Sequence, residues 1–194
     1  MLKINKDYPG VDNIQKIPGQ VICTLDIEPK EFVTDCKPFF NNGNSFITDN
    51  EKYNEKLKNT VNYMNIDERI ENYLRSMNIN LVKAVVGLKD TDELPEYKPY
   101  DTKQKKEKRI KATCFDTKFY INGKITSKTE FTNKYSNGGF NEYKSNIKCN
   151  KIFIRIMSNK YVSWELKYEI NSIHLNTNLS KGVFFDDSES DDDY

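Results

Sequence analysis

Two apolar segments near the end of the chain constrain its fold more than any other feature. They are Ile152–Met157 (IFIRIM) and Tyr161–Ile170 (YVSWELKYEI), and the three residues between them suit a turn. In the second segment apolar and polar residues alternate, which places every second side chain on the same side of a strand. The pair predicts an antiparallel hairpin with one buried face, and it assigns Trp164 and Tyr168 to the interior. The alternation then changes phase, which predicts a bulge or bend in Asn171–Leu175.

Asn122-Gly123 is the strongest turn signal in the chain. Both central residues of a type I′ turn need a positive φ, which asparagine and glycine tolerate best. The dipeptide lies between two extended segments, Arg109–Ile121 and Lys124–Phe131. It therefore predicts a second hairpin.

Three further segments have the composition of strands. Gln20–Glu28 alternates between apolar and polar residues, and Pro29 is expected to end it. Phe32–Phe40 is a weaker extended candidate. Asn80–Leu88 is a short valine-rich run, which is typical of a buried strand.

The helical signal is confined to one region. Residues 50–77 carry apolar side chains at three- and four-residue intervals, which predicts one long or two short amphipathic helices packed on a sheet. Residues 1–19 hold two Pro-Gly pairs among polar residues and are predicted to form an irregular arm. The sequence thus predicts a mainly β, α+β fold, with one OB-like five-stranded barrel over residues 20–175 and a helical insertion at about 50–77. Residues 176–194 are predicted to be a flexible linker and an acidic tail.

The inventory of reactive residues favours a protein that is not an enzyme and that uses no metal or cofactor. No C-x-x-C pair occurs, and His174 is the only histidine, which excludes the usual zinc spacings. Nucleotide-binding glycine loops and the G-x-S-x-G motif are absent. The four scattered cysteines, predicted to be reduced and part of the core, are Cys23, Cys36, Cys114 and Cys149. A nuclease-like metal site is the alternative, and its candidate carboxylates are Asp26, Glu28, Asp116, Glu130 and Glu165.

The sequence shows no signal peptide pattern and no run of 18 apolar residues. The expected location is therefore cytoplasmic or nuclear, which includes a viral replication site, and no membrane partner is expected. A homo-oligomer is compatible with the sequence.

Charge is strongly segregated along the chain. Lys98–Tyr168 contains 17 Lys or Arg, 6 Asp or Glu and 12 aromatic residues, whereas the net charge of the whole chain is only +1. Cations neutralise phosphates, and flat rings stack on unpaired bases. Lysine outnumbers arginine, which favours contact with the backbone, because bidentate reading of bases prefers arginine. The segment predicts a surface that binds single-stranded nucleic acid, although lysines that only solvate a surface are a simpler interpretation.

Two sets of side chains are candidates for this surface. Basic residues are expected to contact phosphates, and aromatic residues at turns, or beside glycine, asparagine or lysine, are expected to stack on bases. The predicted phosphate-binding residues are Lys103, Lys105, Lys106, Lys108, Arg109, Lys111, Lys118, Arg155 and Lys160. The predicted stacking residues are Tyr120, Tyr135, Phe140 and Tyr143.

The acidic end of the chain is predicted to regulate that surface. Asp186–Tyr194 holds six acidic residues among nine, too many like charges to fold alone. A short tether gives it an effective concentration on the order of millimolar, so it is expected to compete with nucleic acid and, once released, to bind partner proteins. The predicted tail contacts are Asp186, Asp187, Glu189, Asp191, Asp192, Asp193 and Tyr194.

The order of these features resembles that of replicative single-stranded DNA-binding proteins of phages and large DNA viruses. The resemblance rests on the β-rich basic body, the late aromatic strand Tyr161–Leu166, and Gly182–Phe185 leading into the acidic end with its final Tyr194. It implies an OB fold, sequence-independent binding of exposed DNA strands in replication, recombination or repair, and recruitment of replication proteins by the tail. An RNA-binding protein and an acidic-tailed chaperone for basic partners are the alternatives.

Overall fold

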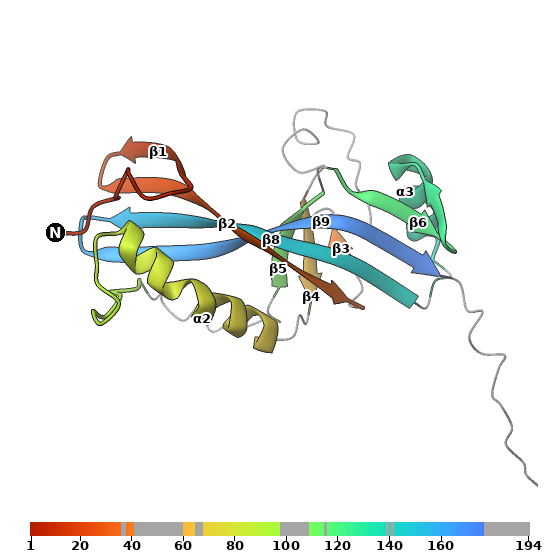
Figure 1. The fold of residues 1–194 in the computed structure, drawn as a ribbon. Coiled ribbons are helices and arrows are strands. Elements are labelled where there is room, and N and C mark those ends of the chain that lie inside the picture. Colours follow the sequence, from red (N-terminus) through yellow and green to blue (C-terminus); the bar gives the residue numbers. More distant parts are fainter. Residues whose placement is uncertain are drawn as a thin grey trace, which may run out of the picture.

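The computed structural model describes residues 1–35, 38–40, 60–64, 68–97, 109–114, 116–138, 140 and 142–176. Within these residues the strands form one nine-stranded sheet, and two helices pack on it (Figure 1). The helices are α2 (Glu68–Val85) and α3 (Lys128–Asn137). The strands are β1 (Val11–Ile17), β2 (Gln20–Thr34), β3 (Pro38–Phe40), β4 (Thr60–Met64), β5 (Arg109–Thr113), β6 (Lys118–Ile121), β7 (Lys124–Thr126), β8 (Glu142–Met157) and β9 (Tyr161–Asn176).

Two long antiparallel strands, β8 and β9, form the centre of the sheet. On one side β2 pairs with β8, and β1 pairs with β2. On the other side β5 and β6 add parallel to β9 at different levels, followed by β4 and β3 beside β5 and by β7 beside β6. The sheet is strongly twisted and curled (Figure 1). The predicted mainly β, α+β class is confirmed. Among the described residues the pairings follow an open path from β1 to β3, so the five-stranded OB-like barrel stays a prediction.

Both predicted hairpins are present. Asn122 and Gly123 join β6 to β7 with φ values of 48° and 76°, as a type I′ turn requires. Ser158, Asn159 and Lys160 join β8 to β9, and the first two have φ values of 50° and 54°. The second hairpin is longer than predicted, because its strands continue to Glu142 and Asn176.

Bulges let the long strands keep one face buried. Asn146 lies opposite Ser172 and Ile147 lies opposite Ile170, so Asn171 is an extra residue in β9 and the predicted change of phase is confirmed. The prediction that Pro29 ends its strand is wrong. β2 continues to Thr34, because Pro29 lies where the register with β8 shifts and a missing N–H breaks no ladder hydrogen bond.

The core lies between the sheet and the helices. Alternate residues of β8 and β9 are buried, and Trp164 and Tyr168 are among them, as predicted. Cys23, Cys114 and Cys149 are buried and unbonded. Burial raises the thiol pKa of Cys23 to about 11, of Cys114 to about 12 and of Cys149 to about 11. The side chain of Cys36 lies outside the described residues.

The helical prediction is wrong in its boundaries. Residues 60–64, which fall inside the predicted helix, form β4 between β3 and β5, whereas residues 50–59 and 65–67 lie outside the described part. The predicted buried strand Asn80–Leu88 belongs mostly to α2. Its apolar residues Val82 and Val85 continue a buried stripe that begins at Leu74, and helical spacing explains that stripe.

The N-terminal arm is more ordered than predicted. Val11–Ile17 forms the edge strand β1 rather than irregular chain. The amide of Asn5 donates to the carbonyl of Val85 over 2.7 Å, and the amide of Lys3 donates to Val86. These bonds satisfy carbonyls that the end of a helix leaves unpaired.

The predicted return strand Lys124–Phe131 is only partly present. β7 ends at Thr126, and Ser127 then caps α3 by accepting a hydrogen bond from the amide of Glu130 over 3.1 Å. Ser127 and Glu130 have the spacing of a capping box, a helix-start signal in the sequence that the strand interpretation overlooked.

Candidate functional site

The sheet has one face that the two helices leave uncovered. The side chains of β8 and β9 that alternate with the buried ones are polar or partly exposed, and both helices pack on the opposite, apolar face. We call the side of β2, β8 and β9 that the two described helices leave uncovered the polar face. An open sheet face with polar and aromatic side chains is a common platform for single-stranded nucleic acid.

An aromatic residue with cations around it lies on the polar face, in the half of the sheet near the β8–β9 turn. The Arg155 guanidinium carbon is 5.6 Å from the centre of the Phe153 ring, and the Lys167 ammonium is 4.8 Å from it. Phe153 is half-buried rather than part of the core. We call Phe153, Arg155 and Lys167 the Phe153 patch. It combines a flat ring with positive charge, the two features that a stacked base and its phosphate require.

Carboxylates balance most of the lysines on the polar face. Their ion pairs are Lys144–Glu142 at 2.6 Å, Lys148–Glu169 at 3.2 Å, Lys151–Asp26 at 3.7 Å and Lys167–Glu165 at 3.0 Å. Such surface pairs contribute only about 0–1 kcal/mol each, so a lysine can turn toward a phosphate at small cost. Arg155 differs from these lysines, because it forms no ion pair with another described residue, and its Nε is buried without a hydrogen-bond partner.

A cleft of about 280 Å³ lies on the polar face, near the end of β9. Its lining residues are Val33, Lys144, Ser145, Asn146, Ser172, His174 and Asn176. We call it the His174 cleft. Burial, and in second place the nearby Lys144 ammonium, lower the pKa of His174, so its imidazole is neutral at neutral pH.

The predicted phosphate-binding residues do not gather in one place. Lys118 is exposed at the start of β6, opposite Ser172, whereas Lys160 is exposed in the β8–β9 turn. Eleven residues of β9 separate these two levels, a distance of about 35 Å along a strand. Arg155 belongs to the Phe153 patch.

The other predicted cations lie in or near the central segment that is outside the described residues. Lys103, Lys105, Lys106 and Lys108 lie outside the described residues, and so do the side chains of Arg109 and Lys111. The backbone of their strand, β5, pairs with β9 at Ala112–Tyr168 and Thr113–Glu169. The basic run of the sequence therefore leads into the sheet directly beside the polar residues of β9.

The prediction of exposed stacking rings is wrong for Tyr135 and Phe140. Both are buried, with 6% and 8% of their surface exposed. Tyr135 faces the core from α3, where the sequence predicts a loop, and its ring lies 6.2 Å from that of Tyr143. Tyr143 is half-buried and donates a hydrogen bond from Oη to the Phe140 carbonyl over 3.0 Å. Burial raises the pKa of both tyrosines.

Only Tyr120, among the four predicted rings, lies at the polar face. It stacks on His174, with ring centres 4.4 Å apart and planes inclined by 2°. The sequence interpretation missed Phe153, Lys167 and His174 as binding residues. The signal for the first was present, since Phe153 and Arg155 alternate with the buried Ile152, Ile154 and Ile156 in the same strand.

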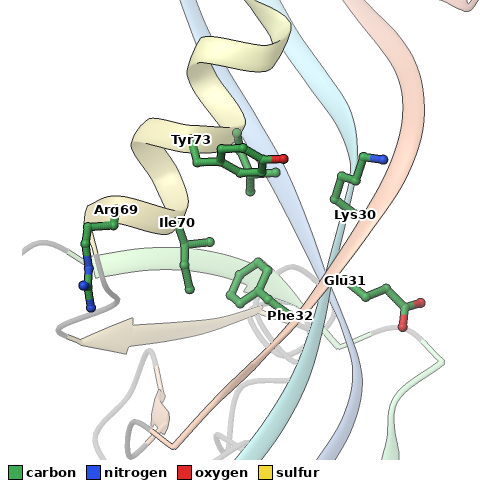
Figure 2. A pocket seen from close by; sticks show the side chains of 7 residues that line it. Lys30, Glu31, Phe32, Arg69, Ile70 and Tyr73 are labelled. Carbon is green, nitrogen blue, oxygen red and sulfur yellow. The ribbon is translucent and has the colours of Figure 1, made fainter.

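A separate groove of about 360 Å³ lies between α2 and β2. Figure 2 shows Ile70 and Tyr73 of α2 facing Phe32 of β2, with Lys30 and Glu31 beside them on the strand. Its lining is mainly apolar, which does not suit a phosphate backbone. The groove is therefore not part of the candidate interface.

The structure provides no support for the alternative metal site. Among the described residues, no group of three or more His, Cys, Asp or Glu side chains lies close enough to hold a metal ion. Nor is either helix in this part of the chain long and apolar enough to cross a membrane.

Comparison with known protein families found no match, and searches of curated proteins and of solved structures found no similar protein.

Proposed function

We propose that this protein binds single-stranded DNA without sequence preference, along the polar face of its sheet. The observation that carries the proposal is the Phe153 patch, in which a ring on the polar face has two cations within 6 Å of its centre. A base stacks on the ring, and the neighbouring phosphates contact Arg155 and Lys167. Stacking on an aromatic ring tolerates every base, which explains the absence of sequence preference.

The basic central segment supports the proposal. β5, at the end of that segment, pairs with β9, the strand that carries Lys167. A DNA strand bound on the polar face also contacts the basic residues of this segment. These residues add phosphate contacts to the few that the sheet provides. The OB-like barrel belongs to the same proposal, because OB folds bind single strands on a curled β-sheet.

The acidic tail completes the proposed function. Asp186–Tyr194 competes with DNA for the cations when no strand is bound, and it contacts replication proteins when a strand displaces it. The support is the segregation of charge along the sequence, with six acidic residues at the end of a chain whose middle is basic.

The test is a fluorescence anisotropy titration of a labelled 15-mer of oligo-dT at two salt concentrations. Loss of one stacked base is worth roughly 1–3 kcal/mol, so Phe153→Ala should weaken binding about 5- to 150-fold. Tyr73→Ala is the matched control, because Tyr73 is 60% exposed but lies on α2, away from the polar face. Equal affinity of the two variants would refute the proposed interface.

Three further binding measurements test the rest of the proposal. Affinity should fall with rising salt, with a log-log slope of about −0.7 for each phosphate contacted. A protein ending at residue 185 should bind oligo-dT more tightly than the full chain. Stronger binding of single-stranded RNA than DNA would favour an RNA-binding protein, and binding of polybasic peptides without oligonucleotides would favour a chaperone.

A further inference from the structure

A row of side chains crosses three strands at the end of the polar face. Tyr120 on β6 lies opposite His174 on β9, and His174 lies opposite Lys144 on β8. Residues that are directly opposite on neighbouring strands are about 4.8 Å apart, close to the spacing of stacked rings. This explains why Tyr120 and His174 stack with centres 4.4 Å apart. The third position of the row holds a lysine, so within the protein the stack of rings stops at His174.

The His174 cleft begins where the stack stops. His174 lines the cleft and Tyr120 does not, so the cleft lies on the side of the imidazole that faces away from Tyr120. Val33, with 64% of its surface exposed, forms the opposite apolar wall. The cleft volume of about 280 Å³ is large enough for a flat heterocycle beside the imidazole.

Polar groups surround the same space. The Ser172 hydroxyl is 3.1 Å from Nε2 of His174, and the amides of Asn146 and Asn176 also line the cleft. The Lys144 ammonium is held 2.6 Å from the Glu142 carboxylate, and the amide nitrogen of Asn176 donates to the same carboxylate. Hydroxyl and amide groups can donate to and accept from the edge of a heterocycle. The Lys144 ammonium can attract the phosphate of the nucleotide that carries this heterocycle.

We propose that the His174 cleft binds a nucleobase, which becomes the third ring of the Tyr120–His174 stack. This inference rests on the proposed function, because the base comes from the single strand bound on the polar face. Phe153 and Asn146 are seven residues apart in β8, about 23 Å along the strand. One bound strand thus contacts the Phe153 patch with one base and the His174 cleft with another.

His174 makes the test direct, because it is the only histidine and its imidazole gives a single set of proton NMR signals. The full chain is titrated with the 15-mer of oligo-dT, with an abasic 15-mer of the same length and with thymidine monophosphate. A base stacked on the imidazole should move the Cε1 proton signal upfield through its ring current. The abasic strand should not, because it has phosphates but no ring.

A blocking variant separates the cleft from the rest of the interface. Val33→Trp fills the cleft from its exposed wall, and because Val33 is not part of the core the variant should fold normally. It should abolish the shift and weaken oligo-dT binding by at least about fivefold, the loss expected for one stacked base. Met77→Trp is the matched control, since Met77 is 43% exposed on α2, which packs on the opposite face of the sheet, and it does not line the cleft. It should leave both the shift and the affinity unchanged.

The outcomes distinguish this proposal from the proposed function. A shift with oligo-dT that disappears in Val33→Trp supports the cleft, and a similar shift with thymidine monophosphate would show that the base enters without its strand. Binding of oligo-dT without any shift, or an equal shift with the abasic strand, would refute base binding in the His174 cleft. Neither result would contradict the Phe153 patch as a binding site. If oligo-dT does not bind at all, both proposals fail.

Discussion

The contacts of Trp164 lead to a quantitative prediction about how α2 is held on the sheet. Trp164 is buried on the apolar face, and its indole nitrogen donates to Oε1 of Glu96 over 2.5 Å. The guanidinium carbon of Arg75, from α2, is 3.8 Å from the centre of the indole ring. Arg75 also donates to the Trp164 carbonyl and to Glu96. Glu96 therefore joins the segment after α2 to both the helix and β9.

Glu96→Ala removes two interactions of different strength. The buried indole N–H loses a charged acceptor, which costs about 1.5–3 kcal/mol because the donor stays out of water. The ion pair with Arg75 adds little, since about a third of each side chain is exposed and such pairs contribute about 0–1 kcal/mol. We therefore expect a loss of about 2 kcal/mol in the free energy of unfolding, which for a chain of this size lowers Tm by about 4–8 °C.

Urea unfolding followed by the fluorescence of the single tryptophan measures this loss directly. Glu93→Ala is the matched control, because Glu93 is an exposed carboxylate in the same segment. Glu96→Gln should recover part of the stability, since its amide oxygen can still accept from the indole. The reasoning is refuted if Glu96→Ala and Glu93→Ala unfold at the same urea concentration.

Four other results are expected. Binding of oligo-dT should leave tryptophan fluorescence nearly unchanged, because Trp164 lies beneath α2 and not on the polar face; strong quenching in a titration would place the interface elsewhere. Burial lowers the pKa of His174 in the folded protein, so its contribution to stability is complete above the unfolded pKa of about 6.5 and is lost as pH falls through the folded pKa. Unfolding of the wild type should therefore show a steeper loss between pH 7.5 and pH 5 than unfolding of His174→Gln, and equal slopes would contradict this. In a Cys36→Ser variant, a thiol reagent at neutral pH should label the native protein slowly and label three cysteines after denaturation, because thiols with a pKa of about 11 or 12 are almost entirely protonated. Ser127→Ala removes the cap of α3 and should cost about 1 kcal/mol in thermal unfolding, against little change for the exposed control Thr129→Ala.

The candidate site was only partly predictable. Arg155 was identified from its charge, and Tyr120 from its place beside a turn, and both lie on the polar face. Phe153 was missed although its alternation with buried isoleucines is visible in the sequence. The stack between Tyr120 and His174 has no sequence signal, because the two residues are far apart in the chain and meet only through the parallel pairing of β6 with β9.

Tyr135 and Phe140 show the limit of judging exposure from neighbouring residues. Glycine, asparagine and lysine surround both rings in the sequence and indicated an exposed loop. A capped helix instead directs Tyr135 into the core, and the backbone of Phe140 accepts a bond from Tyr143. Burial here depends on contacts with Phe131 and Tyr143 that sequence spacing does not encode.

The sequence by itself determined the elements whose signals are local. Alternation over β8 and β9, the positive φ values at Asn122 and Gly123, and the phase change at Asn171 all follow from the identity of adjacent residues. Tertiary structure alone decided between helix and strand for two segments. Residues 60–64 form a strand because β3 and β5 flank them. The apolar run that ends at Val85 is helical because one side of it packs on the sheet. The physical reason is the same in both cases: short apolar segments satisfy helix and strand periods almost equally, so the choice depends on partners that are distant in the chain.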